Sequence, residues 1–209
     1  LVAPDGTVVG TAGTRPLNVA PGAGADFREE VTVTDPVLWD LDRPLLYEAR
    51  LTLRSGDEES DGERIPFGIR EARFDSDTGF WLNGKNLKIK GVCLHHDGGA
   101  FGAAVPLSVW EERLGRLRKL GVNALRTAHN PPAKAFMEIA DEMGFLVMSE
   151  FSDVWRSPKT AYDYARFFDE WADRDVAAWV RRDRNHPSLI LWCVGNEIQD
   201  THLDAEDGA

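Results

Sequence analysis

The chain has 209 residues, 43% of them hydrophobic and 28% charged, a composition typical of a soluble globular protein with a buried core. Its 35 acidic and 24 basic residues give a net charge of −11, which would repel the phosphate backbone of nucleic acids and suits a neutral partner better. No run approaches the roughly 20 apolar residues of a membrane span. We therefore expect neither nucleic acid nor a membrane as a partner.

The sequence opens at Leu1 in the middle of a pattern, with no charged-then-apolar signal segment. We expect it to be part of a longer protein, and its cellular compartment stays undecided.

Residues 1 to about 70 alternate between apolar and polar positions, the pattern of strands with one buried face. The alternation predicts one strand over residues 27–34 and another over 47–53. Turn-forming residues follow at Ser55-Gly56-Asp57 and Asp61-Gly62. The acidic run Asp57-Glu58-Glu59-Ser60-Asp61 is interpreted as a solvated hairpin tip rather than a cation site. This part is expected to be an antiparallel β-domain.

From residue 86 the rhythm changes to strand followed by helix. Apolar runs predict strands, and helical periodicity predicts the segments between them. The strands are expected over 87–94, 122–126, 145–148 and 188–194, and the helices over 108–120, 131–143 and 164–182. Strands separated by helices predict parallel βαβ units. No Gly-x-Gly-x-x-Gly follows the first strand, which argues against a dinucleotide-binding sheet.

Polar residues follow each of the four predicted strands. Such groups at the carboxyl ends of parallel strands describe the active face of a β/α barrel, of which this chain supplies four of eight units. The groups are His95-His96-Asp97, Arg126 with His129, Glu150 with Asp153, and Asn196-Glu197.

Glu197 is the strongest candidate for chemistry because it follows six apolar or small residues at the expected barrel mouth. Partial desolvation there would suit a carboxyl that must donate a proton near neutral pH. Spacing alone fits a helix cap or an ion-pair partner equally well. Asn196 beside it offers both a donor and an acceptor for a sugar hydroxyl, and could also be a turn residue.

His95 and His96 invite a metal interpretation, but adjacent residues on a strand point in opposite directions and chelate poorly. We expect one histidine to face the cleft and the other to lie in the wall. A histidine-rich metal hydrolase remains the weakest alternative, and no metal site or cofactor is predicted. Arg126 and His129 belong to a polar loop in which Arg126 either pairs with a carboxylate to fix the loop or keeps a catalytic carboxylate ionised.

Asp153 and Trp155 could grip and stack on a sugar, although a core tryptophan is an equal reading for Trp155. Cys93 and Cys193 offer no metal or disulfide spacing, so both are expected to be small buried core residues.

Five motifs in order resemble glycoside hydrolase family 2, the β-galactosidase, β-glucuronidase and β-mannosidase group. The chain is most similar to the β-galactosidases. The motifs are Phe67-Gly68-Ile69-Arg70, Gly79-Phe80-Trp81-Leu82-Asn83-Gly84-Lys85, Lys90-Gly91-Val92, Arg126-Thr127-Ala128-His129-Asn130-Pro131, and Arg184-Asn185-His186-Pro187-Ser188 with Gly195-Asn196-Glu197. The resemblance implies a partial immunoglobulin-like β-sandwich over residues 1–70. The first half of a (β/α)8 TIM barrel would follow over residues 71–209.

The same resemblance implies a retaining mechanism with Glu197 as general acid/base. Asn196 would hold the sugar 2-hydroxyl, His95 and His129 would line the pocket, and Arg126 would support the nucleophile. The family's nucleophile comes from a later barrel strand, and Glu206 and Asp207 have no predicted strand to aim them. The magnesium ligands of some β-galactosidases have no counterpart here, since Val154 and Arg156 occupy those positions.

The isolated chain is therefore expected to be inactive, with a carbohydrate as the substrate of the complete protein. The alternative is a non-catalytic sugar-binding or assembly module that forms a homo-oligomer or pairs with the rest of its parent chain.

Overall fold

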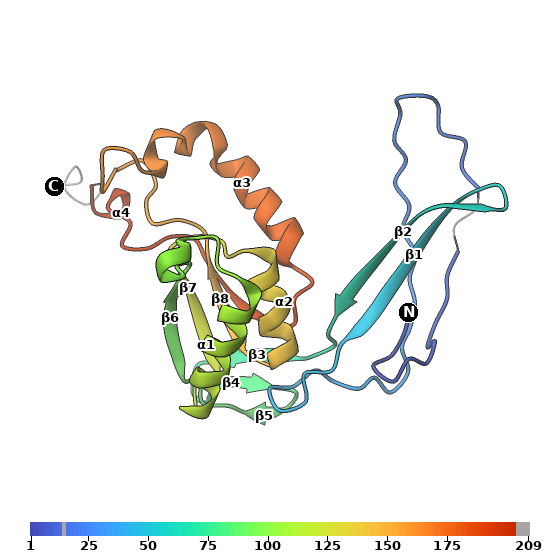
Figure 1. Cartoon of the computed structure of the whole chain (residues 1–209), viewed down its shortest axis with the longest axis horizontal. Coiled ribbons are helices and arrows are strands. Elements are labelled where there is room, and N and C mark those ends of the chain that lie inside the picture. The colour runs from blue at the N-terminus through green and yellow to red at the C-terminus, as the bar shows by residue number, and fades with distance from the viewer. Residues whose placement is uncertain (14–15, 204–209) are drawn as a thin grey trace.

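The structure is a computed structural model that describes residues 1–13 and 16–203. It has two parts, an N-terminal β-hairpin with the extended chain beside it, and a parallel sheet flanked by helices (Figure 1). None of the helices in the described ranges has the length and apolar character needed to cross a membrane.

The hairpin pairs β1 (Tyr47–Ser55) with β2 (Glu58–Phe67) in antiparallel register. The chain reverses at Gly56, whose φ is +64°, and Asp57, so the acidic run lies in this turn and the exposed start of β2, at the hairpin tip as predicted. Tyr47 is buried at the base of the hairpin, where its ring lies 5.7 Å from that of Phe67. Val2 adds isolated bridges to Val8 and Glu48.

The strand predicted over residues 27–34 is wrong. This segment is extended but joins no ladder in the described part of the chain, and Phe27 is 56% exposed. Alternating polarity marks a face that could be buried, but a strand also needs a hydrogen-bonded neighbour.

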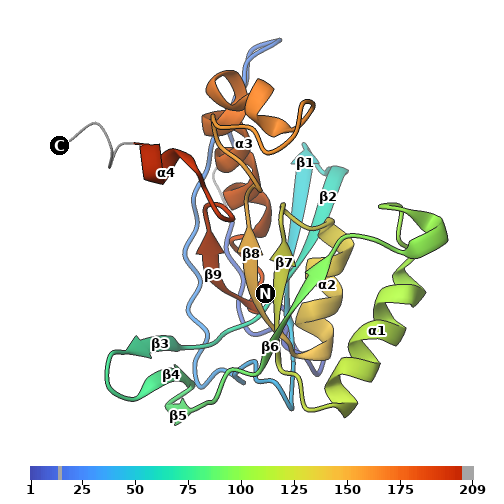
Figure 2. The same cartoon turned by 90° about the vertical axis from the view of Figure 1, so that its left-hand side faces the viewer.

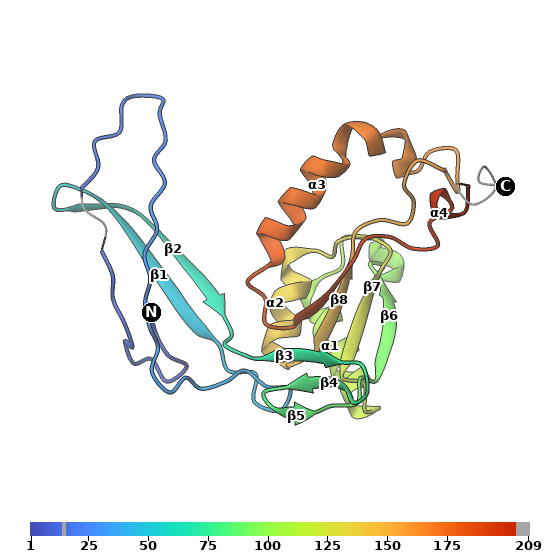
Figure 3. The ribbon, with the colours of Figure 1, turned by 180° about the vertical axis from the view of Figure 1, so that it is seen from behind.

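A small antiparallel sheet of β3 (Ala72–Asp75), β4 (Gly79–Leu82) and β5 (Lys85–Asn86) follows the hairpin. It lies beside the starts of the parallel strands, as Figure 3 shows from behind. Its buried side chains form one cluster with residues before the hairpin and at the first positions of two parallel strands: Trp39, Leu41, Phe80, Leu82, Ala124 and Leu146. This cluster closes the bottom of the parallel sheet.

The parallel sheet contains four strands in the order β6-β7-β8-β9, which is also their order along the chain. Figure 2 shows them side by side. Their bounds are Gly91–His95 for β6, Ala124–Ala128 for β7, Leu146–Glu150 for β8 and Leu189–Cys193 for β9. The four predicted parallel strands are confirmed, although the first is shorter than expected.

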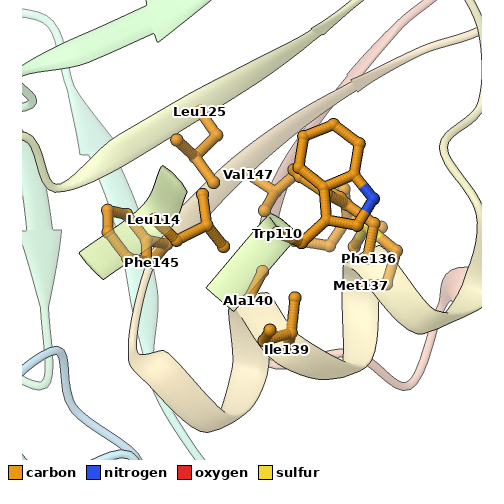
Figure 4. Close-up of a cluster of buried hydrophobic side chains, with 10 residues drawn as sticks. Trp110, Leu114, Leu125, Phe136, Met137, Ile139, Ala140, Phe145 and Val147 are labelled. Atoms are coloured by element: carbon orange, nitrogen blue, oxygen red, sulfur yellow. The ribbon is translucent and has the colours of Figure 1, made fainter. Parts of the chain in front are cut away.

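Three α-helices connect these strands: α1 (Leu107–Lys119), α2 (Lys134–Met143) and α3 (Phe168–Asp183). Short elements lie in the loops, the 3-10 turns η1 (Gly99–Phe101) and η2 (Tyr164–Arg166) and the terminal α4 (Asp200–Leu203). One face of the sheet packs on α1 and α2 through the apolar cluster drawn in Figure 4. Val92 and Leu94 join this cluster, so Cys93 and His95 point to the opposite face of β6.

The helix starts differ from the predictions. α1 begins at Leu107, one residue before the predicted start, and Pro106 before it provides no side-chain cap. The helix expected from Pro131 begins only at Lys134, because Ala133 is still extended at φ −60° and ψ 147°. Pro131 cannot start the helix because it precedes Pro132, and the residue before a proline is kept out of the helical region. The helix expected over 164–182 is divided into η2 and α3 at Phe167.

The prediction that both cysteines are buried is also wrong. Cys93 is exposed and Cys193 is partly exposed. An apolar run predicts a strand that is covered on both faces. Here helices cover one face of β6, and the opposite face, which carries Cys93, is not covered by any of the described residues.

Candidate active site

The polar residues predicted to gather at the strand ends do lie together, at the carboxyl ends of the parallel strands. Arg126 in β7 and Glu150 at the end of the neighbouring strand β8 contact each other, and the turn after β9 brings Asn196 to the same place. The loops after β7 and β8 contribute His129 and Asp153. The parallel register therefore assembles residues that are up to 70 positions apart in sequence.

Glu150 is the buried centre of this group. Its side chain is 0% exposed, with Oε1 2.6 Å from Nδ1 of His129 and Oε2 2.5 Å from Nη2 of Arg126. The contact with Arg126 is an ion pair that lacks hydrogen-bond alignment, since Oε2 accepts no hydrogen bond within the described residues. The backbone N–H of Glu150 donates to the Thr127 hydroxyl at 3.1 Å. A buried carboxylate held between Arg126 and His129 fixes both partners.

Sequence reasoning placed Glu150 at a strand end but gave it no role. The signal that could have found it is the one used for Glu197, namely a carboxyl group directly after a buried apolar strand.

Asn196 is held on both sides of its carboxamide. Its Oδ1 accepts a hydrogen bond from Arg126 at 2.8 Å, and its Nδ2 donates to Asp153 at 2.8 Å. The backbone N–H of Asn196 also donates to the Ser152 carbonyl at 3.0 Å. These bonds fix the amide orientation and leave one N–H and one oxygen lone pair for a further partner.

Asp153 joins Asn196 to Lys159, a residue that the sequence analysis missed. Lys159 Nζ donates to Asp153 Oδ1 at 2.8 Å and to the Asn196 carbonyl at 2.9 Å. Burial alone would raise the pKa of Asp153, but hydrogen bonds from Lys159 and Asn196 outweigh it and hold the pKa below 3.8. Asp153 is therefore an acceptor, not a proton donor, at neutral pH.

Glu197 lies next to this network with its side chain 83% exposed. The partial desolvation expected for it is absent from the described structure. Its Oε2 is 3.7 Å from Lys159 Nζ, and its backbone φ of +46° lies in the left-handed region. Gly195, two residues earlier, packs closely on Ile198, since a Cβ at this position would approach the Ile198 side chain to 2.5 Å. The turn that presents Glu197 is therefore tightly specified.

The two adjacent histidines separate as predicted. The His95 ring lies edge-on to that of His129, with centroids 5.1 Å apart, at the candidate site. The His96 ring packs 5.3 Å from Trp110 on the helix side of the sheet. Within the described ranges no three His, Cys, Asp or Glu side chains converge as a metal site would require.

The side chain of Trp155 makes two contacts with the surrounding structure. Its indole N–H donates to the Val194 carbonyl at 3.0 Å and its ring centroid is 6.0 Å from that of Phe168. These contacts hold the loop after β8 against the end of β9 and the start of α3. Beside this loop is a mostly apolar cavity of about 460 Å³, whose lining includes His129, Asp153, Tyr164 and Trp179.

Two family models match the chain. The model described as glycosyl hydrolases family 2 covers residues 3–70, and the model of the TIM barrel domain of that family covers residues 76–205.

Among curated proteins, β-galactosidase BoGH2A of Bacteroides ovatus is 46% identical over 180 residues, which is 86% of this chain and 21% of that protein. A β-glucuronidase of Bacteroides fragilis is 32% identical and aligns with 95% of this chain and 30% of its own length. Among solved structures, a β-glycosidase from Bacteroides vulgatus superposes with a TM-score of 0.78 at 44% identity, over 83% of this chain and 23% of that one. The chain thus spans between a fifth and a third of the length of these relatives.

Proposed function

The chain belongs to glycosyl hydrolase family 2, and on that basis we propose that it carries the general acid/base half of a retaining β-glycosidase site. The substrate of the complete protein is a terminal β-D-galactoside or a related β-glycoside. The named relatives include a β-galactosidase and a β-glucuronidase, and the higher identity to the former favours galactosides.

The observation that carries the proposal is the fixed network beside Glu197. Arg126 and Asp153 hold the Asn196 carboxamide from opposite sides, and Glu150 anchors Arg126 from below. A side chain held this firmly can bind one sugar hydroxyl in a set position without losing further conformational freedom. The free N–H and lone pair of Asn196 suit the sugar 2-hydroxyl.

In the proposed mechanism the Glu197 carboxyl protonates the glycosidic oxygen while a second carboxylate attacks the anomeric carbon and forms a glycosyl-enzyme. Glu197, now a carboxylate, then takes a proton from water, and the resulting hydroxide releases the sugar and frees the nucleophile. His95 and His129 line the sugar pocket. Asp153 and Trp155 complete its wall.

The nucleophile is proposed to lie outside this chain. A retaining enzyme needs it about 5–5.5 Å from the acid/base carboxyl. The network carboxylates are already engaged, Glu150 with Arg126 and His129, and Asp153 with Lys159 and Asn196. The tail carboxylates Glu206 and Asp207 lie outside the described residues. The chain by itself should therefore not turn over a glycoside.

The test is Glu197→Gln in a protein that continues this chain through all eight strand–helix units. Glutamine cannot donate a proton, so turnover of alkyl glycosides should fall by about 10²-fold or more. Activated aryl glycosides, whose leaving group hardly needs the proton, should lose much less. Equal turnover of wild type and variant on both substrate types would sink the assignment.

A second candidate, an assembly module, is favoured by the open side of the parallel sheet. Within the described residues β6 and β9 have no further strand partner, and Leu191, Trp192 and Val194 are exposed. Unpaired edges and exposed apolar side chains attract another chain. The partner would be the complementary half of the barrel or a second copy of this chain.

A further inference from the structure

Lys159 occupies an unusual position for a lysine, in the loop between β8 and η2. Its side chain is 20% exposed, and its ammonium group lies among three oxygens from two different segments. Lysine side chains are mostly exposed, and those that leave the solvent are usually paired. Two of the oxygens belong to consecutive residues, the carbonyl of Asn196 at 2.9 Å and the carboxylate of Glu197 at 3.7 Å.

The loop around Lys159 is held by its own hydrogen bonds. Asp163 Oδ2 accepts the backbone N–H groups of Lys159 at 2.8 Å and Thr160 at 2.7 Å. Asp200, which follows Glu197 closely in the chain, accepts the N–H groups of Arg156 and Ser157 at 3.1 Å each. The loop is thus tied to the segment that carries Glu197, and the ammonium group approaches from a fixed base.

The contact with the Asn196 carbonyl fixes the peptide that joins Asn196 to Glu197. Glu197 has φ +46°, which residues with a side chain adopt only when their surroundings enforce it. Lys159 contacts both the peptide before this unusual φ and the carboxylate after it. Asp153 Oδ1, 2.8 Å away, orients the ammonium group from the other side.

We propose that Lys159 is a positioning residue that holds the Glu197 backbone and carboxylate in the orientation needed for proton transfer. This inference rests on the proposed function, since it gives Lys159 a task in the step assigned to Glu197. Lys159 itself transfers no proton and acts only through Glu197. Its loss would leave the sugar contacts of Asn196 in place through Arg126 and Asp153 but would free the carboxyl of Glu197 to rotate.

The experiment compares Lys159→Met with wild type in a protein that continues the chain through all eight barrel units. Methionine keeps most of the apolar stem and removes the charge. We expect kcat/KM for alkyl β-glycosides to fall by about tenfold or more, and for activated aryl β-glycosides by less than about threefold. Lys159→Arg, which keeps the charge, should recover part of the loss.

Two controls separate positioning from a general effect. Lys134→Met removes an exposed lysine whose contact is the surface pair with Glu138 at 3.4 Å, and it should alter neither substrate class. Circular dichroism unfolding verifies that each variant is folded. If Lys159→Met does not fold, Lys159→Gln and Lys159→Arg provide the comparison.

Equal losses for both substrate classes, or no loss for either, would overturn the role of Lys159. These outcomes are read against Glu197→Gln in the same protein. If Glu197→Gln discriminates between leaving groups and Lys159→Met does not, the inference about Lys159 fails and the proposed function stands. If Glu197→Gln itself does not discriminate, the proposed function fails.

Discussion

Three side chains near the ends of β7 and β9 depend on one buried carboxylate at the end of β8. Glu150 pairs with Arg126 and His129, and Arg126 in turn holds Asn196. Of these residues, Arg126, His129 and Asn196 could be predicted from their places after apolar strands, because a strand-end polar group in a parallel sheet points to a shared edge. Their mutual pairing could not, since it depends on side chains from three separate segments.

Replacement of Glu150 by glutamine should destabilise the chain strongly. The amide would leave Arg126, which is 27% exposed, without its counter-charge and would weaken the contact with His129 in a mostly buried site. We expect the free energy of unfolding to fall by about 3 kcal/mol, measured by urea denaturation.

Glu138→Gln is the matched control for this change. Glu138 forms a surface pair with Lys134, four residues earlier on the same helix, so its loss should cost less than about 0.5 kcal/mol. Similar losses for the two variants would contradict the central role of Glu150.

At the scale of elements, the helix ends show which local signals held. Gly144 ends α2 as predicted, in the left-handed conformation at φ +70°, and its N–H donates to the Asp141 carbonyl at 3.3 Å. The start of α2 was misjudged because Pro132 keeps Pro131 out of the helical region. Glycine at a helix end is a strong local signal, whereas the first helical residue depends on how the loop before it is held.

Gly144→Ala should be destabilising for two reasons. An alanine is strained at φ +70°, and its Cβ would approach the Leu41 carbonyl oxygen to 2.3 Å. We expect the free energy of unfolding to fall by about 2 kcal/mol or more in thermal or urea denaturation.

The control is Gly115→Ala in the middle of α1, where a Cβ meets no atom within 4 Å. This change should stabilise the chain by about 0.5–1 kcal/mol, because glycine in a helix is costly. A neutral effect at Gly144 would show that the contact with Leu41 can relax.

At the scale of the whole molecule, the chain is an immunoglobulin-like sandwich segment followed by the first half of a TIM barrel. The two parts are joined by specific contacts. Arg70 donates to the carbonyls of Pro187 at 2.8 Å and Leu189 at 2.5 Å, and the Trp39 indole donates to the Asp141 carbonyl. The Asp141 carboxylate also accepts from the Ser188 N–H and lies 2.5 Å from His186. His186 therefore belongs to this junction.

The open side of the sheet can be tested through its cysteines. Cys93 is exposed, whereas burial raises the pKa of the Cys193 thiol and so lowers its thiolate fraction. In the isolated chain at pH 8, iodoacetamide should label Cys93 about tenfold faster than Cys193, as read by mass spectrometry.

A fragment that supplies the remaining four strand–helix units should protect Cys93, if it completes the barrel. In the Cys93→Ser variant, only the slow labelling of Cys193 should remain. Equal labelling of both cysteines, or labelling of Cys93 that the complementary fragment leaves unchanged, would argue against an open and complementable sheet.

Apolar periodicity alone determined the four parallel strands and the helices between them, because burial of an apolar face is a local property of each segment. The order of strand-end residues likewise pointed to Glu197, Asn196 and Arg126. Tertiary structure decided what these residues do to one another. It placed Lys159 against the Glu197 turn, buried Glu150 beneath Arg126, and left Cys93 uncovered, because each of these depends on which distant segments meet at the edge and face of the sheet.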